Sequence, residues 1–384
     1  MTAPRVFSYV QYLQGVGHLY RAAHIAAAMA QAGIDVHLVS GGMPVPTISP
    51  ENVRLHQLPP IRCRDGDFSD LVNADGDPID DGYRDRRRDE LLGLFRRQQP
   101  QVLIIEAFPF GRRQMRFELL PLLEAARSQS PRPLIVCSVR DILQVSSKPV
   151  RARETSDLVN QYYDHVLVHG DPAFARLDDT FSGVAEIDVK IHYTGLVGDL
   201  SKSVPVSAGS TDGEVLVSAG GGATQSEILL SIAMQARGLS QANDRRWRLL
   251  AGPNLPEGEF NNLQLQTPDG VILESNRRDF PSLLAECAVS VSQAGYNTVV
   301  DLLRCGCRSV VVPYSARGET EQLHRARCLK NLRLAHVVEA ARLSPVTLAG
   351  AIDTALAASP PQKSGINVSG AEKSAELVSR WLGE

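Results

Sequence analysis

The chain alternates short apolar runs with helix-like segments along its whole length, and this alternation constrains the fold more than any other feature. Such runs are typical of parallel strands, which are buried on both faces and joined by helical crossovers. In the first half the runs lie at residues 5–12, 36–40, 101–108, 133–139 and 165–170. They resume after Glu214 at residues 215–222, 246–252, 270–275, 288–293 and 309–313. The pattern predicts two separate, doubly wound α/β units.

A segment without periodicity separates the two predicted units. From about Gly195 the sequence reads GLVGDLSKSVPVSAGSTDG, which is rich in glycine, serine and small residues and is typical of a hinge. We therefore place a first domain at residues 1–198, a linker at 199–213 and a second domain at 214–384.

Residues 52–88 of the first domain are rich in aspartate and glycine and have little apolar periodicity. This composition predicts a surface insertion. Its arginine cluster is interrupted by acids, which predicts a solvated helix face. The cluster consists of Arg84, Arg86, Arg87 and Arg88.

Composition excludes several classes of function. The chain has 384 residues and a net charge of −3, which is long enough for two domains and gives no reason to expect a nucleic-acid partner. It begins with MTAPRVFSYV, without the pattern of a secretory signal, and has no apolar run of membrane-spanning length, so we expect a cytoplasmic protein. The six cysteines are scattered, and we expect free thiols.

Residues 292–326 carry the most specific pattern for ligand binding. A short apolar run ends at Ala294-Gly295, and a helix is predicted to follow, with Asn297 and Thr298 near its start. Helix N-termini favour anions such as phosphate, and Asp301, one turn later, is placed to accept hydrogen bonds from ribose hydroxyls. The pattern therefore indicates a nucleotide-sugar site. The alternative is an ordinary strand and helix with a solvated Asp301.

The loop after the next predicted strand, 309–313, supplies further candidates. Glu319, Glu321 and Gln322 precede a predicted helix and are placed to hold the hydroxyls of a sugar. The alternative is that the Glu-Gln pair only opens the helix.

Two glycine-rich turns each follow a predicted strand. The turn with Gly220, Gly221, Gly222 and Thr224 opens a helix, which suits backbone N–H groups that contact a diphosphate. No Gly-Lys-Ser/Thr follows it, so it is not a Walker loop, and tight strand–helix packing is the alternative. The other turn contains Gly15, Gly17 and His18. It lacks the third glycine of a dinucleotide fingerprint.

These features in this order resemble the donor half of GT-B glycosyltransferases, and most closely family 28. Within that family the chain looks most like bacterial predicted glycosyltransferases. The resemblance implies two Rossmann-like, doubly wound domains that face each other across a cleft. The first domain would bind the acceptor and the second the nucleotide-sugar donor. The last helix, 370–384, would pack back on the first domain.

The resemblance also implies roles for residues of the first domain. Gly15 and Gly17 would lie on the acceptor side, and His18 would contact the acceptor or act as general base; a structural His18 that caps its helix is the alternative. Glu106, at the end of the strand VLIIE, is the second candidate for the base. Its alternative role is an ion pair with Arg112, Arg113 or Arg140. The turn at 169–172 also resembles a family feature, but a simple strand-ending turn explains it.

The implied reaction is inverting transfer of a hexose-type sugar, with UDP the expected nucleotide, to an acceptor hydroxyl. The glycines at 220–222, Asn297 and Thr298 would stabilise the departing diphosphate, and Arg277 would add positive charge. No acidic pair of the DxD type follows a strand at an obvious donor position, so we expect neither a metal nor another cofactor.

The acceptor class and two rival functions stay open at this stage. A lipid-linked acceptor would fit the family, a small metabolite is also possible, and membrane contact would be peripheral at most. One rival is a nucleotide-sugar hydrolase or 2-epimerase on the same fold. The other is a non-catalytic nucleotide-sugar binding protein.

Overall fold

The structure is a computed structural model that divides into two compact units. Unit 1 comprises Met1–Asp199 and Asn367–Glu384, and unit 2 comprises Leu200–Ile366. The residues that the structure describes are 3–64, 66–145, 149–198, 212–220, 226–252, 255–275, 277, 279–314, 318–361 and 364–383. Residues 199–211 of the predicted linker lie outside these ranges.

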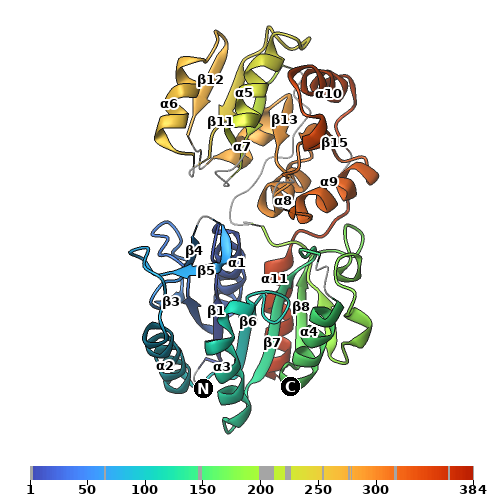
Figure 1. The fold of residues 1–384 in the computed structure, drawn as a ribbon. Coiled ribbons are helices and arrows are strands. Elements are labelled where there is room, and N and C mark those ends of the chain that lie inside the picture. Colours follow the sequence, from blue (N-terminus) through green and yellow to red (C-terminus); the bar gives the residue numbers. More distant parts are fainter. Residues whose placement is uncertain are drawn as a thin grey trace. The chain divides into compact units, whose positions relative to one another are not determined.

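Unit 1 is built on a seven-stranded parallel sheet with the strand order β3-β2-β1-β6-β7-β8-β9 (Figure 1). The strands are β1 (Arg5–Val10), β2 (Asp35–Ser40), β3 (Val53–Gln57), β6 (Val102–Glu106), β7 (Leu134–Arg140), β8 (His165–His169) and β9 (Lys190–Tyr193). A separate antiparallel pair is formed by β4 (Arg62–Arg64) and β5 (Asp67–Val72). The strand order reverses next to β1, as in doubly wound folds, which bind ligands at the carboxyl ends of the strands around such a point.

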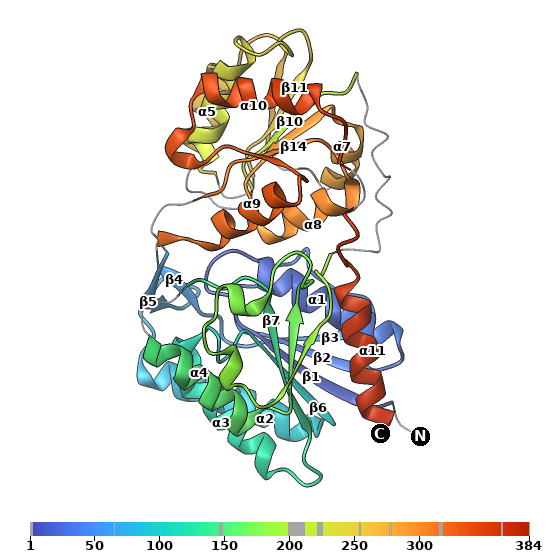
Figure 2. The ribbon, with the colours of Figure 1, turned by 90° about the vertical axis from the view of Figure 1, so that its right-hand side faces the viewer.

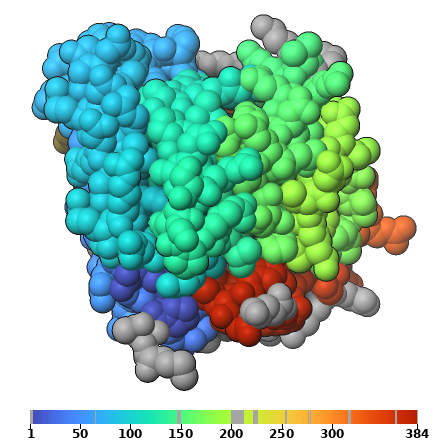
Figure 3. Space-filling model, turned by 90° about the horizontal axis from the view of Figure 1, so that it is seen from below, coloured from blue at the N-terminus to red at the C-terminus, as the bar shows by residue number. Residues whose placement is uncertain are grey.

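Helices cover both faces of this sheet. Alternate residues of β1 point to opposite faces, so Phe7 and Tyr9 join the core under one helix layer and Val6 and Val10 join the other. The first layer consists of α2 (Asp81–Gln98), α3 (Arg116–Ser128) and α4 (Pro149–Tyr162), and the second of α1 (Gly17–Gln31) and α11 (Gly370–Gly383). Figure 3 shows the blue-to-green surface of α2, α3 and α4 on one side of unit 1 and the red α11 on the other.

The last helix belongs to unit 1. Helix α11 packs along α1, as Figure 2 shows, although the two helices lie at opposite ends of the sequence. Close approach at its start requires glycine, because a Cβ on Gly370 would lie 2.2 Å from the carbonyl oxygen of Gly195. Near its end, Trp381 stacks on His165 at a centroid distance of 4.2 Å.

The segment at 52–88 differs from the predicted surface insertion. Its first part is β3, which extends the parallel sheet beside β2, and its last part opens α2. The alternation of apolar residues is weak in β3 because it is an edge strand with largely exposed side chains.

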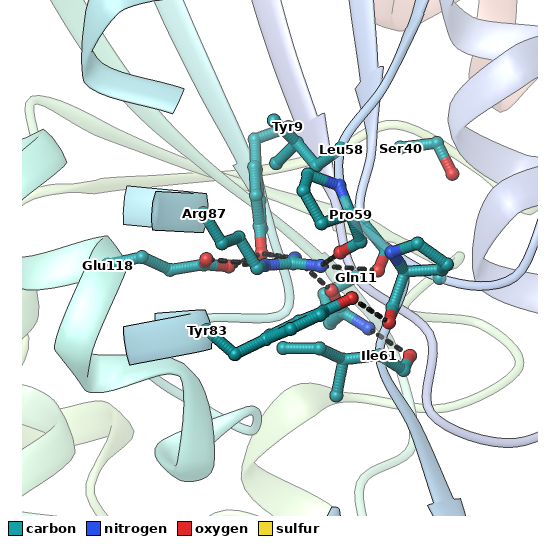
Figure 4. A network of polar contacts seen from close by, with 12 residues as sticks. Tyr9, Gln11, Ser40, Leu58, Pro59, Ile61, Tyr83, Arg87 and Glu118 are labelled. Atoms are coloured by element: carbon teal, nitrogen blue, oxygen red, sulfur yellow. Dashed lines mark hydrogen bonds and ion pairs between the residues drawn. The ribbon is translucent and has the colours of Figure 1, made fainter. Parts of the chain in front are cut away.

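The prediction of a solvated arginine face was wrong for Arg87. This side chain is fully buried, while Arg86 and Arg88 are at least partly exposed. Its guanidinium forms an ion pair with Glu118 of α3, with 2.6 Å between Nε and Oε2, and donates to Gln11 Oε1 at 2.6 Å and to the Gly41 carbonyl at 2.8 Å (Figure 4). A buried charge is tolerated here because every side of the group has an acceptor.

Unit 2 repeats the doubly wound plan with a six-stranded parallel sheet in the order β12-β11-β10-β13-β14-β15. Its strands are β10 (Val215–Ser218), β11 (Trp247–Leu250), β12 (Val271–Glu274), β13 (Val289–Ser292), β14 (Ser309–Val311) and β15 (His336–Val337). Its helices are α5 (Ser226–Arg237), α6 (Glu257–Leu265), α7 (Phe280–Glu286), α8 (Tyr296–Cys305), α9 (Glu321–Asn331) and α10 (Pro345–Ala357). The prediction of two Rossmann-like α/β domains is confirmed.

Short 3₁₀ helices complete the described structure, at η1 (Arg113–Met115), η2 (Leu177–Asp179), η3 (Val184–Glu186) and η5 (Ala340–Arg342). All six cysteines are free, as predicted. Within the described ranges, none of the helices combines the length and apolarity needed to span a bilayer.

Candidate active site

The carboxyl ends of β1, β6, β7 and β8 bring polar side chains together at one edge of the unit 1 sheet. These four strands are direct neighbours, so residues that follow them converge although they are distant in sequence. His18 comes from the first turn of α1, directly after β1, and Glu106 is the last residue of β6.

The two candidates for the general base contact each other. His18 Nδ1 lies 3.1 Å from Glu106 Oε1. Arg21, one helical turn after His18, forms an ion pair with the same carboxylate oxygen. Glu106 is only 2% exposed and His18 is 14% exposed, so the carboxylate is enclosed while part of the imidazole reaches the surface.

The charges of this cluster set the protonation of both groups. Burial lowers the pKa of His18 well below its usual value, and the positive charges of Arg112, Arg21 and Arg140 lower it further against the opposing hydrogen bond with Glu106. Burial alone would raise the pKa of Glu106, but Arg21 and His18 outweigh it and hold that pKa well below its usual range. At neutral pH the pair is therefore a neutral imidazole beside an ionised carboxylate.

A chain of buried polar groups lies behind Glu106. Ser138 donates its hydroxyl proton to Glu106 Oε2, and Ser138 Oγ lies 2.8 Å from Nε2 of His169. The other ring nitrogen of His169, Nδ1, lies 2.9 Å from Thr194 Oγ1. Burial lowers the pKa of His169 to about 3, so it is neutral and suited to hold Ser138 by donating from Nε2.

The sequence analysis did not predict this row of buried polar groups. It treated His169 as part of a strand-ending turn and did not consider Ser138. The available signal was that both residues lie at the carboxyl ends of predicted strands, in β7 and β8, next to the strand of Glu106.

The alternative role of Glu106 was an ion pair with Arg112, Arg113 or Arg140, and the structure pairs this carboxylate with a different arginine. Its arginine is Arg21, whereas Arg113 pairs with Glu154 at 2.7 Å. Arg112 donates from Nε to the Gln11 carbonyl at 2.7 Å instead. Arg21 reaches Glu106 because it lies one helical turn after His18, on the same face of α1.

The glycines of the first turn have different reasons to be glycine. Gly15 has a φ of +52°, a conformation that favours glycine, and an added Cβ would meet no other atom. Gly17 is the first residue of α1 and precedes His18 directly. Their predicted position on the acceptor side stays a prediction.

In unit 2, the predicted phosphate-binding turn ends β13 and opens α8. Gly295 is the N-cap of α8, and Asn297 and Thr298 lie in its first turn, where N–H groups have no partner inside the helix. Asp301 follows on α8 and is half-buried. Thr298 lies on the Gly295 side of the turn, since its Oγ1 would be 3.9 Å from a Cβ on that glycine.

Gln322 holds this turn in place. Its Oε1 accepts from the backbone N–H of Ala294 at 3.1 Å and from that of Tyr314 at 3.0 Å, so it joins the loops after β13 and β14. The Gln322 N–H in turn donates to the carboxylate of Glu319 at 3.0 Å. Glu321 is buried at the start of α9. The oxygen of the Gln322 side chain is thus already engaged by the protein, and a sugar contact stays a prediction for both residues.

A buried arginine, which sequence reasoning missed, lies behind the same turn. Arg325 is 1% exposed, donates from Nη1 to the Ala294 carbonyl at 3.0 Å and lies over the Tyr296 ring. Its Nε and Nη2 have no hydrogen-bond partner among the described residues. The turn before α8 therefore has a fixed positive charge beneath it, which adds to the helix dipole.

The remaining donor-side candidates are only partly described. Gly220 has a φ of +73°, and a Cβ there would lie 3.3 Å from Gln293 Oε1. Gly221, Gly222 and Thr224 lie outside the described residues. Arg277 forms an ion pair with Asp279 at 2.7 Å, so its predicted contact with a diphosphate would need this pair to open.

The second half of the chain matches a known family of domains. Residues 216–380 match the glycosyltransferase family 28 C-terminal domain. They include the α8 turn, Asp301 and the Gln322 contacts. The second half of the chain therefore carries a glycosyltransferase family 28 C-terminal domain.

Solved structures of several glycosyltransferases share this fold over nearly the whole chain. The calicheamicin glycosyltransferase CalG4 aligns with a TM-score of 0.63 at 15% identity, covering 100% of this chain and 99% of that one. MurG of Acinetobacter baumannii aligns with a TM-score of 0.59 at 13% identity, covering 98% and 99%. UGT2 of Phytolacca americana, solved with UDP-2-fluoro-glucose and pterostilbene, aligns with a TM-score of 0.63 at 14% identity, covering 99% and 94%.

A search of curated proteins found no match. The comparisons thus show the fold of the chain and the family of its C-terminal domain, while its reaction, donor and acceptor have to be argued from its own residues.

Proposed function

We propose that this glycosyltransferase transfers a hexose-type sugar, with inversion and without a metal, from a nucleotide diphosphate sugar to an acceptor hydroxyl. The observation that carries the proposal is the contact between His18 and Glu106. An ionised carboxylate that orients a neutral imidazole is the arrangement that a general base requires.

The proton transfer follows from the tautomer that Glu106 favours. The ionised carboxylate accepts from Nδ1–H of His18. Nη2 of Arg21 lies 3.1 Å from the same ring nitrogen and donates to the carboxylate as well. Nε2 then carries the lone pair and takes the proton of the acceptor hydroxyl. The acceptor oxygen forms a bond to the anomeric carbon, and the bond from that carbon to the diphosphate breaks with its electron pair on the diphosphate.

The donor would bind unit 2 through its diphosphate. The first turn of α8, with Gly295, Asn297 and Thr298, supplies N–H donors and a favourable dipole, and the buried charge of Arg325 reinforces them. The glycine turn at 220–222, with Thr224, would contact the same group. Arg277 would add charge from the loop after β12.

The sugar and the nucleoside would lie beside the diphosphate. Asp301, one turn into α8, would accept from the ribose hydroxyls, and Glu321 and Gln322 would face the transferred sugar. UDP is the proposed nucleotide because UGT2, which shares the fold, was solved with a UDP-sugar.

The first experiment incubates the purified protein with UDP-, GDP- and dTDP-sugars, with and without candidate acceptors, and measures binding and free nucleotide. Nucleotide release that requires an acceptor supports transfer. Release without any acceptor identifies a hydrolase or epimerase, and binding without release identifies a binding protein. Either of the last two results overturns the proposal.

Variants separate the two halves of the mechanism. Asp301→Ala should weaken UDP binding in calorimetry, whereas Asp269→Ala, an exposed acid of the same unit, should not. His18→Ala and Glu106→Gln should lower kcat by about 10²–10⁴ with donor affinity kept, and His24→Ala on the same helix is the control. An unchanged kcat in the first two variants would remove the pair from the reaction.

Metal independence has its own test. Sugar transfer should proceed in EDTA at the rate measured without it. Loss of activity that magnesium restores would show that a metal is required.

A further inference from the structure

Arg112, one of the arginines near His18, has no carboxylate partner among the residues that the structure describes. Its only hydrogen bond within the described part of the chain is from Nε to the Gln11 carbonyl, at 2.7 Å, and it forms no ion pair there. By contrast, Arg21 pairs with Glu106, and Arg113 and Arg116 both pair with Glu154. The two outer nitrogens of Arg112 thus have donors to offer.

Two further arginines, Arg140 and Arg21, act on the Arg112 guanidinium, and Glu106 is the carboxylate that opposes them. The main charges that act on His18 are those of three arginines, Arg112, Arg21 and Arg140, and of one carboxylate, Glu106. Burial and the repulsion of Arg140 together lower the pKa of Arg112 to about 10. Folding places this guanidinium where its charge is unfavourable, and an arriving anion would reverse that cost.

The backbone that carries Arg112 is held in a costly conformation. Both Ala107 and Arg112, at the two ends of the loop after Glu106, have positive φ values of 68° and 59° without being glycine. Such conformations persist only where surrounding contacts enforce them, and they concentrate at functional sites.

The Gln11 carbonyl, which accepts the hydrogen bond of Arg112, belongs to a residue that is held on several sides. Gln11 is fully buried, its Oε1 accepts from Arg87, and its Nε2 donates to the Tyr12 and Ile61 carbonyls at 2.9 and 3.0 Å (Figure 4). The network around Arg87 therefore fixes the carbonyl that holds Arg112 Nε. A guanidinium held by Nε keeps its outer N–H groups ready for bidentate binding.

Two exposed apolar side chains belong to segments that neighbour this cluster in the sequence or through a hydrogen bond. Phe68 is 43% exposed, and its carbonyl accepts from Gln114, two residues after Arg112. Val16, two residues before His18, is 37% exposed. A ligand with an anionic group and an apolar body would suit these surroundings.

We propose that unit 1 binds the acceptor through an anionic group, a carboxylate or a phosphate, held by Arg112 beside the His18–Glu106 pair. That this ligand is the sugar acceptor rests on the proposed function, whereas the anion site rests on unit 1 alone. The site would define the charged group that the acceptor carries.

The test titrates the full chain by calorimetry with inorganic phosphate and, separately, with benzoate. Each titration is run in saturating UDP, so that a phosphate site on unit 2 is occupied, and again without UDP. We expect one saturable site for at least one of the two anions in the presence of UDP. The anion that binds more tightly identifies the group as phosphate or carboxylate.

Variants of Arg112 decide the assignment. Arg112→Gln should weaken this binding by about tenfold or more, as expected for loss of charged hydrogen bonds. Arg112→Lys, which keeps the charge but not the fork, should give intermediate binding and covers the case that the glutamine variant does not fold. The matched control is Arg113→Gln, which should bind as the wild type does.

Three results would overturn the proposal: no saturable binding of either anion, unchanged binding in both Arg112 variants, or an equal loss in Arg113→Gln, which would mean an adventitious ion only. Failure of the proposed function looks different. In that case UDP does not bind at all, and the anion titrations without UDP still report on Arg112.

Discussion

The buried ion pair between Arg87 and Glu118 makes a quantitative prediction for the stability of unit 1. Both side chains are fully buried, and Arg87 donates to four further acceptor groups besides the carboxylate: Gln11, the carbonyls of Gly41 and Pro59, and the Tyr9 hydroxyl. Removing either partner leaves the other charge enclosed, which typically costs about 3–5 kcal/mol.

The two partners should differ in their effect. Glu118→Gln keeps an oxygen that can accept from Arg87, so we expect a loss of about 3 kcal/mol in the free energy of unfolding. Arg87→Met leaves Glu118 unpaired and also leaves the acceptors of Gln11, Gly41 and Pro59 without their donor. Each such acceptor costs about 1–3 kcal/mol, so the loss should be about 5 kcal/mol or more.

The two tryptophans allow unit 1 to be followed separately. Trp381 lies in α11 of unit 1 and stacks on His165, and Trp247 lies in β11 of unit 2. In a Trp247→Phe background, Trp381 fluorescence during guanidinium unfolding reports on unit 1, and a parallel melt should show a drop in Tm of roughly 6–12 °C for Glu118→Gln.

Arg88→Met is the matched control on the same helix. Arg88 is partly exposed and pairs with Asp85 and Asp89 at the surface, so its loss should stay within about 0.5 kcal/mol. If Arg87→Met and Arg88→Met destabilise unit 1 equally, or if the Arg87 variant loses less than about 1 kcal/mol, the argument from enclosed charge is wrong.

Three further predictions concern pH and packing. The activity should be constant from about pH 8 to 6.5 and fall only at lower pH, because His18 must be neutral and its pKa lies well below about 6.5; a nucleotide-release assay that already loses activity above pH 7 would contradict this. The unfolded state takes up a proton at His169 near pH 6.5, whereas the folded state does so at about 3, so the stability of unit 1 should fall as the pH drops through this window. His169→Gln should make that slope shallower by about 1.4 kcal/mol per pH unit, and an identical slope would refute it. Gly370→Ala would place a Cβ 2.2 Å from the Gly195 carbonyl and should destabilise unit 1 by about 1–3 kcal/mol in the Trp381 assay, whereas wild-type stability would show that α11 shifts freely.

Much of the fold could be predicted because local pattern carries it. The apolar runs that predict strands became β1, β2, β6, β7 and β8 in unit 1 and β10 to β14 in unit 2. Strand β3 was not predicted, because an edge strand with exposed side chains lacks the apolar alternation of a buried one. Arg87 was misplaced for a related reason: a charged residue among charged neighbours gives no local sign that it points inward.

The sequence by itself determined which chemical groups the sheet edges carry: a glycine turn with His18 after the first strand, a carboxylate at the end of the strand VLIIE, and a glycine N-cap with Asn297 and Thr298 in unit 2. Each of these depends only on residues that are adjacent in the chain. Tertiary structure alone decided that His18 and Glu106, 88 residues apart, form one pair. It also decided that the arginine paired with the Glu106 carboxylate is Arg21 and not Arg112. The physical reason is that a parallel sheet brings the ends of distant strands together, and the order of its strands is not written in any local pattern.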